Sequence, residues 1–595
     1  MFSVLKISGV RLKILPEHKT GNIIRNMQGE YMTEAGNNYS EKKTQLHISV
    51  RNLVEFIFRE GDIDNRSSRA MSADAMMEGT RIHRKIQGSM GKEYQAEVPL
   101  SLVVEGDLYE LTVEGRADGI FTEDGKCFVD EIKGMYRKVE LFEKPVFVHR
   151  AQAMCYAYIF ALQNNMETIG IQMTYCNLET EQTKYFREEF SFEEIKKWFD
   201  DLMEEYGKWA TFQCEMKNQR QASIKELGFP FEYRPGQKKL VSDVYRTIMR
   251  QKLLFMQAPT GVGKTISTIF PAVKAVGEEL ADRIFYLTAK TITATVAKET
   301  FALLEKNGYR AKTIQITAKE KLCPCDEMEC NPVTCPYAKG HFDRVNDAVF
   351  DLLHRCEMIE RDDILSQADR YTVCPFELCL DTASWCDNII CDYNYVFDPN
   401  VYLKRFFQEG IKGDYIFLID EAHNMVERSR QMYSAQIYKE DFLTVKRIMK
   451  EHSRSIEKAL EKCNKILLGM KRECENYTVY DTFGNMVFSF MRLMTLLDEF
   501  LQKANEFPGK KDVMDFYFEL RNFLNIYDLV DEHYVMYSEL EADGRFMLKL
   551  FCVDPSLNIQ KRLDKGKSAV FFSATFLPVN YYKSLLSTKK DNYAI

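Results

Sequence analysis

The chain has 595 residues, of which 45% are hydrophobic and 28% charged, and its formal net charge is −8. This length exceeds what one hydrophobic core supports, so we expect three or four domains. The negative net charge excludes a uniformly basic nucleic-acid-binding protein, so any such site would be a local basic groove.

No stretch of about 18 consecutive apolar residues occurs, which predicts a protein without a membrane span. The apolar run at Met1–Leu12 is interrupted by Lys6 and Arg11 and is too short for a secretory signal. The 16 cysteines are clustered. We therefore expect a cytoplasmic protein whose cysteines bind a metal or a cluster rather than form disulfides.

Residues 1–45 show weak hydrophobic periodicity and many polar side chains, so we expect a poorly defined leader. The pattern sharpens from residue 46, and residues 46–215 are predicted to form the first domain. Apolar residues at helical spacing predict one helix from Val50 and a second at Met71–Ile86, which carries His83.

A β-hairpin is predicted where two β-like runs, Leu111–Phe121 and Lys126–Lys133, flank Asp124-Gly125. Asp-Gly is a strong signal for a two-residue turn. With that turn, Glu123 pairs with Lys126, and the register of both strands follows.

Two acidic residues meet in this register. Asp118 lies directly opposite Glu131, and Lys133 lies on the same face two residues further on. Opposed like charges destabilise a sheet, so a divalent cation between the two carboxylates would give them a purpose. Lys133 would then orient a water or stabilise negative charge on a phosphate. The alternative is a solvated hairpin with an ordinary ion pair.

Gly115-Arg-Ala-Asp118 followed by Asp130-Glu131-Ile132-Lys133 resembles the PD-(D/E)xK nuclease superfamily, and within it the RecB-like branch. An upstream helical histidine and a downstream Gln-x-x-x-Tyr pair occur in the order of that branch. The resemblance implies a nuclease-like domain that uses Mg²⁺ or Mn²⁺. By the same resemblance, the metal ligands are His83, Asp118 and Glu131, the catalytic lysine is Lys133, and the residues that support the site or contact DNA are Gln152 and Tyr156.

The first domain is predicted to end in a helix. Ser191 and Glu194 form a capping box at its start, and we expect it to end near Trp209. Residues 216–228 are polar and predict a linker, and residues 229–310 begin the next domain.

A phosphate-binding loop follows a short predicted strand at Lys252–Gln257 and precedes a predicted helix at Ile266–Val276. It fits G-x-x-x-x-G-K-[ST], with Ala258 in place of the first glycine. Lys264 should reach the β- and γ-phosphates of ATP, and the Thr265 hydroxyl should hold Mg²⁺. The alternative is a glycine-containing loop without a ligand. The predicted nucleotide-binding residues of the loop are Ala258, Pro259, Thr260, Gly261, Val262, Gly263, Lys264 and Thr265.

Residues 311–390 contain four cysteines whose spacing, with one distant member, can close a loop around a [4Fe–4S] cluster. They are Cys323, Cys330, Cys335 and Cys374. Zinc is the chemical alternative because a four-cysteine site also suits it, and unligated thiols are the third possibility. Four further cysteines nearby complicate the choice of ligands, namely Cys325, Cys379, Cys386 and Cys391.

Residues 391–430 include a second buried strand, which ends in Asp420-Glu421-Ala422-His423. Asp420 should bind Mg²⁺, and Glu421 should polarise the attacking water. Asp-Glu-Ala-His (DEAH) is a signature of superfamily 2 helicases. Its long separation from Lys264 indicates an insertion.

The order of phosphate loop, four-cysteine insert, Tyr393–Pro399 and DEAH resembles the XPD/DinG (Rad3-type) helicase family. The resemblance covers residues 229–430 and resumes near 549–580. It implies ATP and Mg²⁺ as cofactors and 5′→3′ translocation on single-stranded or forked DNA. By resemblance, Gln237 reads the adenine edge, His423 couples the nucleotide site to later motifs, and Ser573 and Thr575 belong to motif III.

The resemblance also implies the fold class, an α/β protein with a RecA-like parallel-sheet motor after the nuclease-like domain. The motor would consist of residues 229–310, 391–430 and 549–595. It would carry an iron–sulfur domain at 311–390 and a helical Arch domain at 431–548. Apolar residues such as Ile456 and Leu460 share one helical face in the latter segment.

We therefore expect an ATP-dependent DNA helicase fused to a metal-dependent nuclease that acts in DNA repair or processing. The family's second RecA-like lobe would follow Ile595, so we expect a fragment, a truncated product or half of a split enzyme. A separate chain supplying that lobe is then a further partner. Two alternatives stay open: a non-hydrolysing module that binds single-stranded DNA, and a nuclease whose motor half is inactive.

Overall fold

The computed structural model describes residues 6–7, 10–13, 43–65, 73–91, 93–136, 138–502 and 507–595. The chain divides into two compact units. Unit 1 comprises Met1–Asp62 and Ser68–Asn218, and unit 2 comprises Ile63–Ser67 and Gln219–Ile595. None of the described helices combines the length and the apolar character that a membrane span requires.

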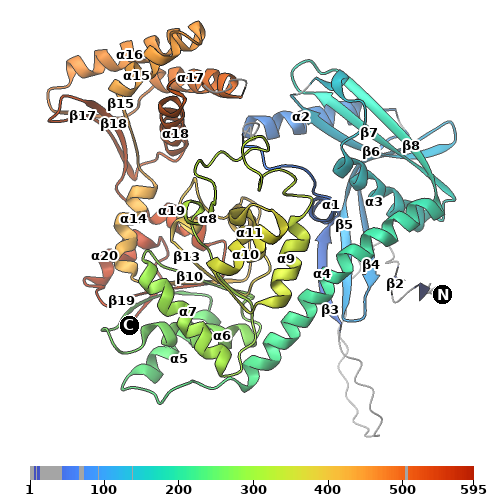
Figure 1. Ribbon diagram of the computed structural model, residues 1–595, viewed down its shortest axis with the longest axis horizontal. Coiled ribbons are helices and arrows are strands. Elements are labelled where there is room, and N and C mark those ends of the chain that lie inside the picture. The colour runs from blue at the N-terminus through green and yellow to red at the C-terminus, as the bar shows by residue number, and fades with distance from the viewer. Residues whose placement is uncertain are drawn as a thin grey trace. The chain divides into compact units, whose positions relative to one another are not determined.

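Unit 1 is built on one mixed sheet with the strand order β1-β2-β4-β5-β6-β7-β8, and β3 pairs with β5 (Figure 1). Helix α3 packs on β6 and β7, and α2 packs on β6. The strands are β1 (Lys6–Ile7), β2 (Val10–Lys13), β3 (Thr44–Ser49), β4 (Gln95–Glu105), β5 (Tyr109–Glu123), β6 (Lys126–Met135), β7 (Thr168–Asn177) and β8 (Thr183–Ser191). The helices are α1 (Val50–Ile57), α2 (Ala73–Ser89), the short η1 (Val139–Leu141), α3 (Phe147–Asn164) and α4 (Phe192–Glu226).

Parts of the predicted leader belong to this sheet. β2 pairs with β4, with Arg11 opposite Glu105, and β3 begins at Thr44. The domain boundary predicted at residue 46 is therefore wrong, because strands this short give no periodicity that could reveal them. The rest of the leader, residues 1–5, 8–9 and 14–42, lies outside the described residues.

The predicted linker at 216–228 is also wrong in most of its length, because α4 continues to Glu226. Its last turns, from Gln219, belong to unit 2, where the Arg220 guanidinium pairs with Asp387 and the Gln221 side chain donates to the Val276 carbonyl at 3.0 Å. Ile224 is buried in the same core. Neither glycine nor proline interrupts the chain between Trp209 and Glu226, so nothing ends the helix at the predicted place.

The larger part of unit 2 is a parallel sheet with the strand order β12-β11-β13-β10-β14-β19-β9-β20. The carboxyl ends of β14, β19 and β9 therefore lie side by side. The strands are β9 (Leu253–Gln257), β10 (Arg283–Leu287), β11 (Thr313–Gln315), β12 (Met358–Ile359), β13 (Asn388–Cys391), β14 (Tyr415–Ile419), β19 (Ser568–Ser573) and β20 (Tyr593–Ala594). Helices near the sheet are α5 (Gln237–Met249), α6 (Lys264–Gly277), α7 (Thr291–Lys306), α12 (Asn394–Phe397), α13 (Lys404–Phe407), η2 (Ala422–Asn424), α14 (Met425–Met432), α19 (Ser556–Leu563) and α20 (Val579–Leu586).

The iron–sulfur domain predicted at residues 311–390 does not have those bounds. Residues 311–390 contribute β11, β12 and most of β13 to the parallel sheet. Between these strands lie α8 (Lys319–Leu322), α9 (Val345–Arg355), α10 (Arg361–Tyr371) and α11 (Pro375–Ala383). The segment is thus an elaboration of the motor rather than a separate domain with those bounds.

The segment predicted as a helical Arch contains a sheet as well as helices. The antiparallel order is β15-β18-β17-β16, with β15 (Ala435–Tyr438), β16 (Tyr477–Tyr480), β17 (Tyr534–Leu540) and β18 (Phe546–Cys552). Its helices are α15 (Lys439–Met449), α16 (Arg454–Glu473), α17 (Asn485–Leu501) and α18 (Lys510–Tyr527). The predicted apolar face of α16 is buried, as Ile456 and Leu460 illustrate. β15 and β16 were missed because each pairs with a strand far along the sequence, whereas β17 and β18 form a local hairpin whose pattern was not recognised.

Candidate functional sites

The register predicted for the hairpin of unit 1 is confirmed. Glu123 lies opposite Lys126, and the ladder continues to Gly119 opposite Asp130. Asp124 and Gly125 have φ of 51° and 75°, and positive φ at both central residues is what a type I′ turn requires. The Asp–Gly turn thus determines which side chains of β5 and β6 meet.

The residues predicted for the nuclease site come together on one face of this sheet. Next to the ladder, Asp118 Oδ2 accepts a hydrogen bond from the Ile132 N–H at 2.7 Å, and Asp118 Oδ1 lies 3.5 Å from His83 Nδ1 on α2. Lys133 Nζ lies 2.7 Å from Glu131 Oε1. The constellation thus draws on two strands and on α2.

Helix α3 adds the remaining pair of predicted residues. Lys133 Nζ lies 3.4 Å from Gln152 Oε1. The Tyr156 hydroxyl reaches the Gln152 side chain and the Arg116 backbone. A Cβ at Gly115 would lie 2.5 Å from the Tyr156 hydroxyl, so only glycine fits this position of the Gly-Arg-Ala-Asp stretch.

Glu131 is a buried acid whose hydrogen bonding is incomplete. It is 2% exposed, and its Oε2 has no hydrogen-bond partner. Burial, and secondarily the charge of Asp118, raise the pKa of Glu131 to about 8. The pKa of His83 is also raised, because its contacts with Asp118 outweigh the opposing effect of burial. A buried carboxylate oxygen without a partner is costly, and a divalent cation would supply the partner.

The donor chemistry of His83, Asp118 and Glu131 therefore fits a divalent cation. Among the residues that the structure describes, however, no three His, Cys, Asp or Glu side chains are arranged to hold a metal ion. The observation in favour of a nuclease metal is the unpartnered Glu131 Oε2, and the metal itself is a proposal.

Asp130 points to the opposite face of β6, as strand alternation predicts. It is fully buried and accepts hydrogen bonds from Thr174 Oγ1 at 2.6 Å, Tyr94 OH at 3.0 Å and Gln172 Nε2 at 3.2 Å. Its oxygens are thus satisfied by protein groups, unlike those of Glu131.

The phosphate loop connects β9 to α6. Gly261 and Gly263 have φ of 84° and 79°, conformations that favour glycine, and α6 begins at Lys264. Gln237 is buried, donates to the Val262 carbonyl at 3.0 Å and accepts from the Arg234 N–H at 3.0 Å. Its observed contacts support the loop, and reading of adenine by Gln237 stays a prediction.

The DEAH residues follow β14. His423 Nδ1 lies 2.8 Å from Ser573 Oγ and 3.2 Å from Glu421 Oε2. The Thr575 N–H in turn donates to Ser573 Oγ at 3.1 Å. Glu421 has φ of +47°, a left-handed conformation that costs a non-glycine residue about 1–3 kcal/mol and clusters at functional sites. DEAH and motif III are therefore in direct contact.

Sequence reasoning missed one residue of this site, Tyr286 on β10. Its hydroxyl donates to Asp420 Oδ2 at 2.6 Å inside the core. The available signal was a tyrosine, whose hydroxyl usually finds a hydrogen-bond partner when it is buried, within the apolar run Ile284–Leu287.

The four predicted cluster cysteines line one cavity, together with Lys319, Pro324, Tyr337, Ala338, Pro375, Phe376 and Ile63. A [4Fe–4S] cluster binds each thiolate at a different iron, so its cysteines surround a space rather than meet at one point. Among the described residues no three of these thiols converge on a single ion, so the observation in favour of a cluster is their shared cavity. Cys325 is a neighbouring thiol, with its sulfur 3.9 Å from that of Cys335.

Ile63 was not foreseen at this cavity. The Ile63 N–H donates to the Ala338 carbonyl at 2.9 Å, and the Asn65 N–H donates to the Cys330 carbonyl at 2.9 Å. These two main-chain bonds hold residues 63–65 against the cysteine-bearing loop, which corrects their assignment to the first domain. No local pattern predicts such a long-range contact.

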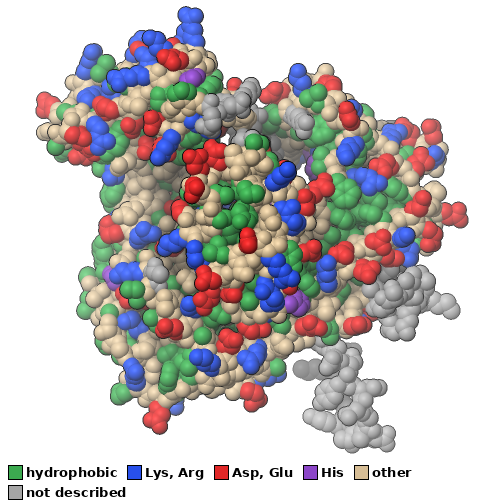
Figure 2. Space-filling model, in the orientation of Figure 1, with side chains coloured by type: hydrophobic (Ala, Val, Ile, Leu, Met, Phe, Trp, Pro, Cys, Tyr) green, Lys and Arg blue, Asp and Glu red, His purple; other side chains and the backbone are tan. Residues whose placement is uncertain are grey.

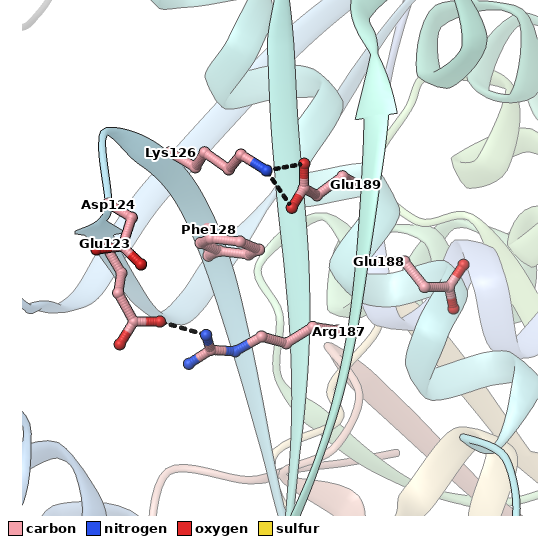
Figure 3. A pocket seen from close by; sticks show the side chains of 7 residues that line it. All are labelled: Glu123, Asp124, Lys126, Phe128, Arg187, Glu188 and Glu189. Carbon is pink, nitrogen blue, oxygen red and sulfur yellow. Dashed lines mark hydrogen bonds and ion pairs between the residues drawn. The ribbon is translucent and has the colours of Figure 1, made fainter.

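A second hollow, of about 420 Å³, lies beside the hairpin turn (Figure 3). Its cations are already paired, Lys126 with Glu189 and Arg187 with Glu123. On the molecular face drawn in Figure 2, Lys and Arg side chains are likewise interspersed with Asp and Glu side chains. We assign no function to this hollow.

Comparison with known proteins bears on unit 2. Residues 304–442 match the DEAD_2 family. The regulator of telomere elongation helicase 1 of Rattus norvegicus is 20% identical, over 33% of this chain and 19% of its own length. The general transcription and DNA repair factor IIH helicase subunit XPD/RAD3 of Saccharomyces cerevisiae is 23% identical, over 33% of this chain and 29% of its own length.

The chain thus spans less than a third of the length of these curated relatives. A solved structure of truncated XPD has 15% identity and a TM-score of 0.39, covering 60% of this chain and 99% of that one. On the DEAD_2 match and the two curated relatives, the motor part of this chain is similar to XPD/Rad3-type helicases.

Proposed function

We propose that unit 2 is an ATP-dependent DNA helicase motor. The observation that carries this proposal is the meeting of three motifs at the carboxyl ends of adjacent strands: the phosphate loop after β9, DEAH after β14 and motif III after β19. Ligands of open α/β sheets bind at this edge. The Ala258 N–H donates to the Ser573 carbonyl at 3.0 Å, which ties the phosphate loop to motif III.

The residue roles follow from phosphoryl-transfer chemistry. Lys264 neutralises charge at the β- and γ-phosphates, Thr265 and Asp420 hold Mg²⁺, and Glu421 orients the attacking water. His423 contacts both Glu421 and Ser573. Through these contacts, hydrolysis of the nucleotide can change the position of the motifs that contact DNA.

The test is hydrolysis of ATP by the purified chain with and without single-stranded DNA. We expect DNA to stimulate turnover, Lys264→Ala to lose nucleotide binding, and Glu421→Gln to bind ATP without hydrolysing it. DNA binding without any turnover would instead favour the alternative, a non-hydrolysing module on single strands.

We further propose that unit 1 is a metal-dependent DNA nuclease. The unpartnered Glu131 oxygen, facing Asp118 and His83 beside Lys133, supports this second activity. A divalent cation bound there would activate a water and stabilise negative charge on the scissile phosphate. Of the chain's own residues, Lys133 supplies a fixed positive charge beside that phosphate, and Gln152 orients Lys133.

We also propose a [4Fe–4S] cluster at Cys323, Cys330, Cys335 and Cys374, supported by their shared cavity. From the resemblance to the XPD/DinG helicases we propose, in addition, 5′→3′ movement on single-stranded or forked DNA. Iron analysis of the anaerobically purified protein tests the cluster, and stoichiometric zinc without iron would contradict it.

A further inference from the structure

Tyr286 lies where the two predicted Mg²⁺ ligands of the motor approach each other. β10 runs parallel to β14, with Tyr286 paired to Leu418 and Leu287 to Ile419. Asp420 follows Leu418 by two residues, so strand alternation directs Tyr286, Leu418 and Asp420 to the same face of the sheet. Tyr286 is fully buried in the core that also contains Ile266 of α6, the helix that starts with Lys264 and Thr265.

The Tyr286 hydroxyl has two polar neighbours. It donates a hydrogen bond to Asp420 Oδ2 at 2.6 Å, and the Thr265 side chain is its second polar neighbour. An ionised carboxylate only accepts hydrogen bonds, whereas a phenol hydroxyl donates one and accepts others. The tyrosine proton therefore points to Asp420, and the phenol oxygen is left to accept the proton of the Thr265 hydroxyl.

This direction of the hydrogen bonds has a consequence for the metal site. If the Thr265 hydroxyl donates a hydrogen bond to Tyr286, the lone pairs of the Thr265 oxygen remain available to a cation on its other side. Asp420 is held at both oxygens, because Oδ1 also accepts from the Glu421 N–H at 2.8 Å. Asp420 is thus oriented before the nucleotide arrives.

We propose that Tyr286 is a positioning residue for the Mg²⁺ of bound ATP, acting through Thr265 and Asp420. The proposal rests on the proposed ATPase and adds a residue to it. Hydrogen-bond partners of metal ligands fix ligand orientation, and their loss costs about 10–100-fold in metal affinity. Lys264 differs from Tyr286 in this respect, because its charge acts on the phosphates with or without the metal.

The experiment compares Tyr286→Phe with Tyr309→Phe in the full chain. Both substitutions remove one buried hydroxyl and keep the ring. Tyr309, however, bonds to Asn388, away from the phosphate loop. Binding of a fluorescent ATP analogue is measured across a Mg²⁺ titration and again in EDTA, and thermal unfolding verifies that each variant is folded.

For Tyr286→Phe we expect the Mg²⁺ midpoint to rise by about 10–100-fold, while metal-free binding stays close to that of the wild type. Tyr309→Phe should keep the wild-type midpoint. Adding Tyr286→Phe to Thr265→Val should shift the midpoint less than it does in the wild-type background, since one of its two routes of action is already lost.

Three results would overturn the proposal. One is an unchanged midpoint in Tyr286→Phe. Another is an equal loss of binding with and without Mg²⁺, which would make Tyr286 a packing residue. The third is a wild-type chain that binds no Mg²⁺-nucleotide at all, which would remove the ATPase proposal and this one with it.

Discussion

The two candidate catalytic sites of this chain are both built on sheets, but in different ways. In unit 1, Asp118 and Glu131 come from neighbouring antiparallel strands joined by a two-residue turn. In unit 2, the contributing residues follow β9, β14 and β19, parallel strands whose connections are long. The turn makes the pairing of Asp118 with Glu131 deducible from spacing alone, whereas the second site depends on the strand order of the whole sheet.

The sites also differ in how their buried carboxylates are satisfied. Asp420 receives hydrogen bonds from Tyr286 and from the Glu421 N–H, so protein groups hold it without a metal. Glu131 has a lysine at one oxygen and no partner at the other. We therefore expect a bound cation to stabilise the nuclease-like site more than the motor site.

The largest effect is expected at Glu131. Glu131→Gln keeps the volume of the side chain but removes the charge that a divalent cation needs, so we expect cleavage of labelled single-stranded DNA with Mn²⁺ to be abolished. Lys133→Ala should also lose cleavage while keeping Mn²⁺ binding. Glu123→Gln, on the same hairpin but paired with Arg187, is the matched control and should cleave normally. Normal cleavage by Glu131→Gln would refute the nuclease site.

The second prediction separates the two sites. Lys264→Ala should lose ATP hydrolysis because the cation at the β- and γ-phosphates is gone, yet it should leave single-strand cleavage unchanged. Lys567→Ala removes a lysine paired with Asp414 at the opposite, amino-terminal edge of the sheet and should retain ATPase activity. Loss of cleavage in Lys264→Ala would mean that the two sites do not act independently.

The third prediction concerns the cysteine cavity. Cys374→Ser should reduce iron from about four atoms per chain to nearly none, whereas Cys356→Ser, outside the cavity lining, should keep it.

Ile63→Ser should retain iron at first but lose it faster to a chelator, since a polar residue then lines the cavity. Val333→Ser, at an exposed position of the same loop, is its control. Equal rates of iron loss in the two variants would argue against a shielding role for Ile63.

Local pattern predicted well wherever a short-range rule applies. The Asp124-Gly125 turn determined the hairpin, the Ser191–Glu194 capping box is present at the start of α4, and Gly261 and Gly263 adopt the conformations the phosphate loop needs. In each case the residues that act together lie within a few positions of one another.

Pattern failed where pairing is distant or the signal is weak. β2, β15 and β16 pair with residues far along the chain. The end of α4 was misplaced because its polar composition indicated a linker. Arg220, Gln221 and Ile224 of this segment in fact make contacts within unit 2. Tyr286 and Ile63 act through contacts that no motif contains.

The smallest expected effect is also the sharpest test of the hairpin register, because it compares neighbouring residues. Asp130→Asn replaces a carboxylate that accepts three hydrogen bonds by an amide that also carries donors, so one donor loses its partner. We expect about 1–3 kcal/mol less stability to denaturant, with cleavage close to normal. Glu131→Gln should behave oppositely in EDTA at pH 7, unfolding no more easily than the wild type, because a Glu131 with a pKa of about 8 is largely uncharged there and glutamine keeps its shape.

Adding Mn²⁺ completes the comparison. At a hundredfold excess over its dissociation constant, a ligand that binds only the folded state stabilises it by about 2.7 kcal/mol. The wild type and Asp130→Asn should both gain this stability, and Glu131→Gln should not. If Asp130→Asn instead loses cleavage and the Mn²⁺ effect while Glu131→Gln keeps both, the functional carboxylate is Asp130, and the assignment of the two faces of β6 is reversed.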